Sequence, residues 1–342
     1  MKRSVYINFI IFFFLTSITW AQEPVWLSNQ APRKLKKKFK TSGMHRYCAL
    51  RKKGDDKEGR NRHGSWGKGT DYVQWIRKGA SIERAQYVCP CKNEDYSLVL
   101  KDPMGKDQKI ELIQEDSVCY VKFKLNQEGR YNAYYITQTP SDDALNINVA
   151  KAELISHSCR NGHYKKIDNR PVKFYPEVTD FEIIRIRKSG ETLHHFTTSG
   201  TDEAFQVLYK GKPLSGVPVK IYTQKGWVNT KKTDKDGKVH IDFIQDYFSK
   251  LQELDRRKVY YYMVEADYTA NDSITYKGQT YPKIHYTATM SDGYRPWRLM
   301  YSSKVWGLII FLAVFVITSI GVFVYKERRK RPYKEITFDE SK

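Results

Sequence analysis

Three side chains able to bind a transition metal lie close together in the sequence: His157, Cys159 and His163. On an extended strand His157 and Cys159 point to the same side, because side chains alternate between the two faces. An imidazole beside a thiolate suits zinc, copper or nickel, and His163 would reach back from the following turn. A second interpretation pairs Cys159 in a disulfide with Cys119, whose own strand points it inward. We favour the disulfide in an oxidising compartment and keep a transition metal as the candidate cofactor.

The cysteines as a group indicate an oxidising compartment. The chain has five of them, at Cys48, Cys89, Cys91, Cys119 and Cys159. Two disulfides and one remaining thiol are the expected outcome for an exported protein with this number. The sequence does not fix the pairing, although Cys89 and Cys91 bracket a proline and would form a small strained ring with each other.

Motifs that carry known kinds of catalysis are missing from the sequence. It has no Gly-x-Ser-x-Gly elbow, no His-Glu-x-x-His, no glycine-rich phosphate loop and no Cys-x-x-Cys. Asp234 and Asp236 resemble part of a calcium loop, but the third Asp or Asn and the distant Glu are missing, so we expect a β-turn. Glu191 with the adjacent His194 and His195 is a weaker metal candidate, because exposed neighbouring histidines usually bind no metal. The sequence therefore predicts a protein that is not an enzyme.

The N-terminus has the three parts of a secretory signal peptide. Met1–Arg3 is basic, Ile7–Leu15 is apolar, and Ala21 supplies a small residue where cleavage is expected. The apolar run is too short to cross a bilayer, which needs about 20 residues. We expect cleavage after Ala21, with an uncleaved N-terminal anchor as the less favoured alternative.

The C-terminal end predicts one transmembrane helix. Trp306–Tyr325 contains no charged residue, and at ~1.5 Å per residue such a run covers the ~30 Å hydrocarbon core of a bilayer. Basic residues follow at once, from Lys326 to Arg331, so the positive-inside rule places the tail in the cytoplasm. We expect a single-pass type I protein with a periplasmic body. The inner membrane of a two-membrane cell is favoured, because outer-membrane spans are usually barrels.

Positive charge is concentrated near the start of the predicted body. The formal net charge is +21, and the densest basic run, here called the basic arm, comprises Arg33, Lys34, Lys36, Lys37, Lys38 and Lys40. In a cytosolic chain such a run would indicate nucleic acid. The signal peptide argues against that partner, so we expect an anionic lipid surface, an acidic glycan or an acidic protein. A solvated arm without a partner is the equally weighted alternative.

The body is long enough for two ordinary domains. Abundant tyrosine and recurring Gly, Asp and Asn turns favour short strands over long helices. Period-two alternation, as in Cys119–Leu125 and Phe205–Tyr209, predicts strands with one buried face. We therefore predict a mostly β protein with two antiparallel β-sandwich domains, the second immunoglobulin- or transthyretin-like, plus the C-terminal transmembrane helix. The predicted segments are the signal peptide (1–21), a basic N-terminal arm or loop (22–71), a cysteine-containing β domain (72–165), a β-sandwich (178–290), the transmembrane helix (305–325) and a cytoplasmic tail (326–342).

The second predicted domain resembles a known family. Phe205–Tyr209, Gly211–Val219 and Thr233–Gly237 are similar to a bacterial exported family of unknown function whose named members include NikM-like accessory proteins of nickel and cobalt uptake. The resemblance covers roughly residues 180–290 and extends to the carboxypeptidase-regulatory, transthyretin-like sandwiches. It implies an exported β-sandwich, often with a C-terminal span. Metal-handling members carry a histidine near the mature N-terminus, whereas Gln22–Trp26 contains none.

Two functions remain open after the sequence. The first is a membrane-anchored extracytoplasmic binding or accessory protein, for example in a metal or cofactor uptake system, with a membrane or periplasmic protein as partner. The second is a structural or surface-interaction protein whose basic arm binds an acidic polymer or lipid. Neither involves nucleic acid, and the first domain matches no family we can identify.

Overall fold

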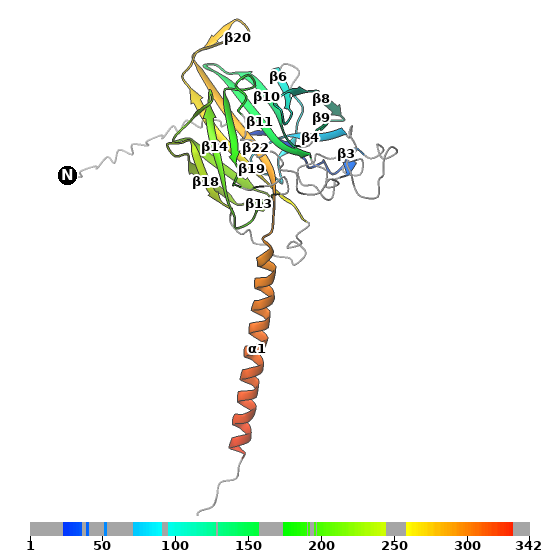
Figure 1. Ribbon diagram of the computed structural model, residues 1–342, viewed down its shortest axis with the longest axis vertical. Coiled ribbons are helices and arrows are strands. Elements are labelled where there is room, and N and C mark those ends of the chain that lie inside the picture. The colour runs from blue at the N-terminus through cyan, green and yellow to red at the C-terminus, as the bar shows by residue number, and fades with distance from the viewer. Residues whose placement is uncertain are drawn as a thin grey trace, which may run out of the picture.

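The computed structural model describes residues 23–35, 39–40, 51–52, 71–90, 95–127, 129–156, 174–189, 191, 195, 197–243 and 258–330. Figure 1 shows a β-rich body from which one long helix descends. The predicted fold class is confirmed: the chain is mostly β, its sheets are largely antiparallel, and one apolar helix lies at the C-terminal end.

Three sheets build the body. The N-terminal sheet has the order β1 (Val25–Ser28), β4 (Asp71–Lys78), β9 (Val118–Lys124) and β8 (Ile110–Glu115), with β5 (Gln86–Tyr87) also on β4. The central sheet has the order β17 (Val228–Lys232), β16 (Pro218–Thr223), β19 (Tyr260–Ala270), β22 (Lys283–Arg295), β11 (Ala144–Ser156), β10 (Gly129–Pro140), β6 (Asp95–Lys101) and β7 (Asp107–Gln108), with β13 (Thr197–Thr198) on β22. The small sheet contains β12 (Phe181–Ile186), β14 (Asp202–Tyr209), β15 (Lys212–Pro213) and β18 (Lys238–Asp242). Two short hairpins, β2 (Phe39–Lys40) with β3 (Arg51–Lys52) and β20 (Ile274–Tyr276) with β21 (Gln279–Tyr281), complete the strands.

The central sheet is covered on both faces where β10 and β11 run. Leu145, Ile147 and Val149 of β11 belong to the hydrophobic cluster shared with the small sheet, whereas Ala150 and Ala152 belong to the cluster shared with the N-terminal sheet. Successive side chains of a strand point to opposite faces, so β11 supplies both cores at once. This is why the strand is buried almost throughout instead of alternating between apolar and polar residues.

A parallel strand pair joins the two predicted sandwiches. Strand β11, from the first, runs alongside β22, from the second, in a register that extends from Ala144 opposite Lys283 to Ala152 opposite Ser291. The two halves therefore share one central sheet, a connection that the antiparallel alternation did not predict. Parallel neighbours need a long crossover, which here consists of everything between the two strands.

The predicted N-terminal arm or loop (22–71) contains a core strand. Within β1, Trp26 and Leu27 are fully buried, and the strand pairs with β4 from Val25 opposite Lys78 onward. It also crosses β22, because the Thr289 hydroxyl donates a hydrogen bond to the Val25 carbonyl oxygen at 2.6 Å. Part of the segment 22–71 therefore belongs to the folded core, because β1 connects the N-terminal and central sheets.

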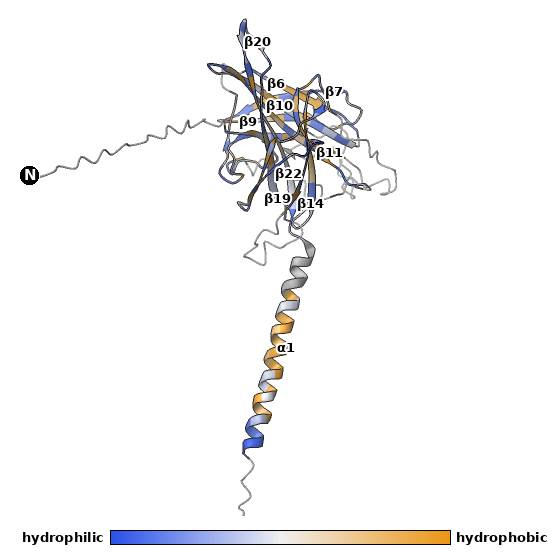
Figure 2. Ribbon diagram, turned by 90° about the vertical axis from the view of Figure 1, so that its left-hand side faces the viewer, coloured by the Kyte–Doolittle hydropathy of each residue, from blue (hydrophilic) through white to orange (hydrophobic). Residues whose placement is uncertain are grey.

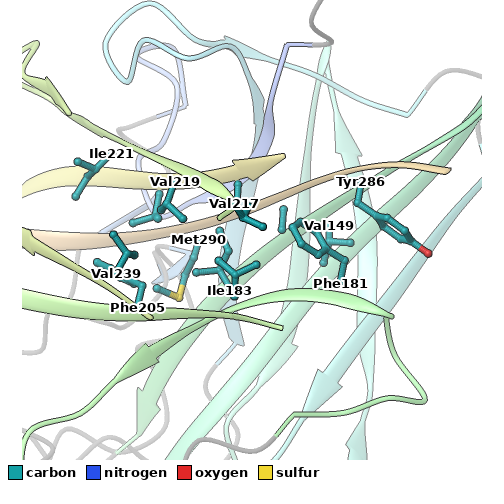
Figure 3. Packing of buried hydrophobic residues seen from close by; sticks show 14 of the residues in the cluster. Val149, Phe181, Ile183, Phe205, Val217, Val219, Ile221, Val239, Tyr286 and Met290 are labelled. Carbon is teal, nitrogen blue, oxygen red and sulfur yellow. The ribbon is translucent and has the colours of Figure 1, made fainter. Parts of the chain in front are cut away.

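The larger core fills the space between the central and small sheets. Figure 3 shows Phe205 and Ile183 of the small sheet facing Met290, Val149 and Val219 of the central sheet. These side chains are buried almost completely, and burying each one is worth roughly 1.5–3 kcal/mol. Apolar and polar residues alternate in strands such as β16, because only one face of the strand is buried in this core.

Helix α1 (Arg298–Arg329) continues from β22 after only two residues, Pro296 and Trp297. An 18-residue stretch within Val305–Arg329 has a mean hydropathy of 2.8, and this is the one described helix long and apolar enough to cross a membrane. Figure 2 shows hydrophobic residues along the middle of the helix. The helix is longer than the predicted span of 305–325, and at ~1.5 Å per residue it exceeds the thickness of a hydrocarbon core.

Candidate functional site

The predicted metal set cannot be placed. His157, Cys159 and His163 all lie outside the described residues, so this set stays a prediction. Among the residues that the structure describes, no three His, Cys, Asp or Glu side chains are grouped to hold a metal ion. The cysteines Cys48 and Cys91 also lie outside them.

The favoured pairing of Cys119 with Cys159 is wrong. Cys119 forms its disulfide with Cys89, at a Cα–Cα distance of 4.9 Å. The cause is the short strand β5, which pairs with Arg77 and Lys78 of β4 and carries the following residues beside β9. Cys119 does point inward as expected, into the cluster between the N-terminal and central sheets.

The basic arm starts on the outer face of the N-terminal sheet. Arg33 and Lys34 are exposed, whereas the next residue, Leu35, is buried in a cluster with Trp75 and Tyr120. The backbone of Lys40 lies in β2, and Lys36, Lys37 and Lys38 lie outside the described residues. The arm is therefore attached to the sheet by an apolar side chain at the point where its basic run begins.

A groove lined with lysines is formed by β8 and β9 of the same sheet together with Gln108 of β7 in the central sheet. Its volume is about 290 Å³, close to the lower end of the range for small-ligand pockets. We call it the basic groove, and it is lined by Gln108, Lys109, Glu111, Lys122, Phe123, Lys124 and Asn126. Three lysines stand against one glutamate, so the groove attracts negative charge.

The strand pattern of β9 places the groove and the arm on one face. Tyr120, Lys122 and Lys124 alternate with the inward residues of the strand, so all three point to the outer face. Leu35 packs against Tyr120 on that face. Lys109 is 2.5 Å from Glu111 at the neighbouring edge of the sheet, and the Lys109 side chain is 85% exposed. The sequence contained this signal in the alternation of β9, but the arm alone was identified as the basic site.

Glu191, the weaker metal candidate of the sequence, forms an ion pair with Arg185. Arg185 lies 2.7 Å from both Glu191 and Glu203, so its guanidinium takes the place a metal would need. His195 Nε2 is 3.5 Å from Glu203 and 4.0 Å from Glu191, and His194 lies outside the described residues. The arrangement is a buried network of ion pairs in which the Arg185 guanidinium supplies the positive charge.

This network belongs to a larger set of buried charges between β10, β11 and the small sheet. Lys151 contacts Glu182, which also accepts a hydrogen bond from the Tyr134 hydroxyl at 2.8 Å. Arg187 is 2.8 Å from Glu153. Burial would raise the pKa of Glu153, but the charges of Arg187 and Lys151 outweigh it and lower this pKa to about 2. We call the set the buried charge seam, and it comprises Arg130, Lys151, Glu153, Glu182, Arg185, Arg187, Glu191 and Glu203.

A second ionic cluster lies on the opposite face of the central sheet. Lys220 Nζ is 3.3 Å from Glu265 and 3.1 Å from Asp267. Burial, together with the neighbouring Asp267, raises the pKa of the Glu265 carboxyl. Lys220 is about one-third exposed and Asp267 is exposed, so solvent screens much of this cluster.

The turn expected at Asp234 and Asp236 is present. The Asp234 carboxylate accepts hydrogen bonds from the backbone N–H groups of Asp236 at 2.9 Å and Lys238 at 2.8 Å. Gly237 has a φ of +69°, and a Cβ there would lie 2.8 Å from the Leu214 nitrogen. Glycine is required by this turn between β17 and β18, and one oxygen of the Asp234 carboxylate accepts both backbone N–H groups.

Comparisons with known proteins give no family. No protein-family model matches the chain, and no curated protein matches it. A solved structure of a 1.5-MDa bacterial ice-binding adhesin matches 66% of this chain and 57% of that chain, with 7% identity and a TM-score of 0.21. A DUF4785-family protein from Legionella pneumophila matches 57% of this chain and 47% of that chain, with 13% identity and a TM-score of 0.20. Both matches span less than two thirds of the neighbour, and neither supports an inference about function.

Proposed function

We propose that the protein is a membrane-anchored extracytoplasmic binding module that holds an acidic polymer in the basic groove. The observation that carries this proposal is the outer face of the N-terminal sheet. There Lys122 and Lys124 line a groove, and Leu35 attaches the start of the basic arm to the same face. A polyanion following the sheet would meet both sets of positive charges, and each contact would release bound counterions.

The position of the groove favours a polymer over the lipid of the anchoring membrane. Figure 1 shows β8 and β9 at the side of the body, well away from the point where α1 begins. The proposed orientation follows from the signal peptide and from the basic residues after the span, with the body in the periplasm and the helix in the inner membrane. The uptake-accessory role implied by the family resemblance has no comparable support, because its predicted ligands lie outside the described residues.

The test is binding of poly-L-glutamate to the full-length protein in nanodiscs of neutral lipid. The double variant Lys122→Gln, Lys124→Gln is expected to weaken binding about 30-fold, since each lysine near an anionic surface contributes about 1 kcal/mol. The affinity of the unmodified protein should fall linearly with salt on a double logarithmic plot, and the variant should have a smaller slope.

The matched control is Lys212→Gln with Lys232→Gln. Both residues are exposed and belong to strands β15 and β17, away from the N-terminal sheet. This variant loses the same charge and should bind poly-L-glutamate nearly as well as the unmodified protein. Equal losses for the two double variants would mean that only net charge matters, and the groove proposal would then be wrong. Binding to phosphatidylglycerol vesicles without binding to the polymer would point to lipid instead.

A further inference from the structure

A buried lysine and a buried glutamate touch where the central sheet meets the small sheet. Lys151 of β11 is 2% exposed and Glu182 of β12 is 0% exposed. The Lys151 ammonium contacts Glu182 Oε1, and it also donates a hydrogen bond to the Ile183 carbonyl oxygen at 3.3 Å. The Tyr134 hydroxyl donates to the same glutamate oxygen at 2.8 Å. An amine and a carboxyl group are therefore held together in an interior that excludes bulk water.

The hydrogen bonds at this contact leave one oxygen of the glutamate without a donor. Glu182 Oε2 is buried, and no described residue donates a hydrogen bond to it. Glu153 Oε1 is buried in the same way, and it lies 3.9 Å from Lys151 Nζ. Buried oxygen atoms usually have a partner, so a simple ion pair fits this site poorly. An amide would fit it better, because Oε1 would still accept from Tyr134, one N–H would still donate to Ile183, and Oε2 would be lost.

We propose that Lys151 and Glu182 condense into an amide bond, which cross-links β11 of the central sheet to β12 of the small sheet. Lys151 Nζ attacks the carboxyl carbon of Glu182, so that a C–N bond forms and the bond from that carbon to Oε2 breaks. Two protons of the ammonium leave with Oε2 as one water molecule, and the reaction therefore needs no oxidant or activating group. Glu153 is placed to take a proton from Nζ and to pass it to the leaving oxygen. Arg187, 2.8 Å from Glu153, makes this carboxylate a weak base, so the reaction should be slow and follow folding.

Burial decides whether such a pair condenses. In water an ammonium and a carboxylate stay apart as ions, because both are strongly solvated. In the protein interior both lose that solvation, and two groups fixed side by side react as if they were at very high concentration. The chain contains its own comparison, since Lys101 Nζ lies 2.8 Å from Glu177 but the Glu177 side chain is 57% exposed. Water solvates the Glu177 carboxylate, so we expect no bond between Lys101 and Glu177.

Mass spectrometry of the full-length protein in detergent tests the proposal. After its disulfides are reduced, the protein should be lighter by one water molecule than the sequence from its observed N-terminus requires, and denaturant should not restore the mass. Trypsin should not cleave after Lys151, and the digest should contain a branched peptide that joins Lys151 to Glu182. No branched peptide should join Lys101 to Glu177, although the two pairs are similarly close.

Two variants separate the bond from the fold. Lys151→Met with Glu182→Leu replaces the pair by apolar side chains, a change that buried ion pairs often tolerate, and should give the mass of an unlinked chain. Glu153→Gln keeps both reacting groups and should slow the loss of water roughly 100-fold in freshly synthesised protein.

The proposal is overturned if the unmodified protein has its full calculated mass, or if trypsin cleaves it after Lys151. Branched peptides formed equally at Lys101 and Glu177 would also overturn it, because burial would then make no difference. An unchanged rate in Glu153→Gln would overturn the role given to Glu153 in proton transfer.

Discussion

Two layers cover opposite faces of the same central sheet through apolar cores, and they differ in the other interactions that stabilise each layer. The small sheet packs over a large aromatic and aliphatic core that ends in the buried charge seam. The N-terminal sheet packs over a smaller core and carries the disulfide between Cys89 and Cys119. One layer thus adds ion pairs in a low-dielectric interior to its apolar core, and the other adds a covalent bond within the N-terminal layer.

The difference predicts how each layer fails. Removing one partner of a buried ion pair lowers the free energy of unfolding strongly, because the remaining charge is buried without a counterion or water to solvate it. A disulfide acts mainly on the unfolded chain, by shortening the loop that must be closed. Damage to the seam should therefore depend on which charge is removed, whereas loss of the disulfide should have the same effect whether it follows from reduction or from substitution of its cysteines.

The largest effect is expected from Arg185→Met. This change leaves Glu191 and Glu203 buried without their cation and should lower the free energy of unfolding by about 3–5 kcal/mol. Chemical denaturation of the full-length protein in detergent measures it. Lys220→Met removes the cation of the more exposed cluster and should cost no more than about 1 kcal/mol. Similar losses for the two variants would contradict the role we assign to burial.

Loss of the disulfide should rank second. Cys89 and Cys119 are 30 residues apart, and closing a loop of that length is worth roughly 3–4 kcal/mol in the chain-entropy estimate. The double variant Cys89→Ala, Cys119→Ala should show this loss under both oxidising and reducing conditions. The unmodified protein should lose the same amount only when a reductant is added. An unmodified protein insensitive to reductant would show that the bond does not support this layer.

A smaller effect is expected where β1 crosses β22. Thr289→Val removes the hydroxyl that donates to the buried Val25 carbonyl oxygen and should lower the free energy of unfolding by about 1–2 kcal/mol. Thr287→Val is the matched control, because that hydroxyl donates to the exposed Asp267. The control should lie within about 0.5 kcal/mol of the unmodified protein in the same denaturation experiment.

The smallest effect concerns the pH dependence of the Lys220 cluster. The folded-state pKa of Glu265 is raised above 4.5 by burial and by Asp267, while Lys220 and Tyr222 act against the rise. A raised carboxyl pKa contributes stability that is fully present below pH 4.5 and is lost as the pH increases through the folded-state value. Glu265→Gln should therefore remove part of the decline in unfolding free energy on the alkaline side of pH 4.5. If the unfolding free energy of the variant varied with pH as in the unmodified protein, Lys220 would already compensate the negative charge of Glu265.

Local patterns in the sequence predicted individual strands but not their partners. The alternation of Tyr120, Lys122 and Lys124 with apolar neighbours predicted β9. The basic face of the groove was not predicted. The parallel pairing of β11 with β22 joins segments more than 100 residues apart, and no local pattern encodes such a pairing. The error at Cys119 has the same origin, because its partner is positioned by β5, a strand of two residues.

Burial of charge was equally hard to predict. The sequence of β12 presents Arg185 after a run of apolar residues, which is also what an exposed strand end looks like. Only the packing of β10 and β11 over the small sheet shows that this arginine is enclosed. Strand β1 was missed because four residues, Val25–Ser28, are too few to display a period.

The continuity of β22 with α1 has a mechanical consequence. The strand leaves the body with its last residues held by β13, and the Trp297 N–H donates to the Ser199 hydroxyl at 3.0 Å just before the helix. Only Pro296 and Trp297 separate the helix from β22. A force applied to the helix therefore acts along β22 and loads its hydrogen bonds to β11 and β19 in shear. Mechanical unfolding would then require the backbone hydrogen bonds of β22 to break together, rather than one after another from the end of the strand.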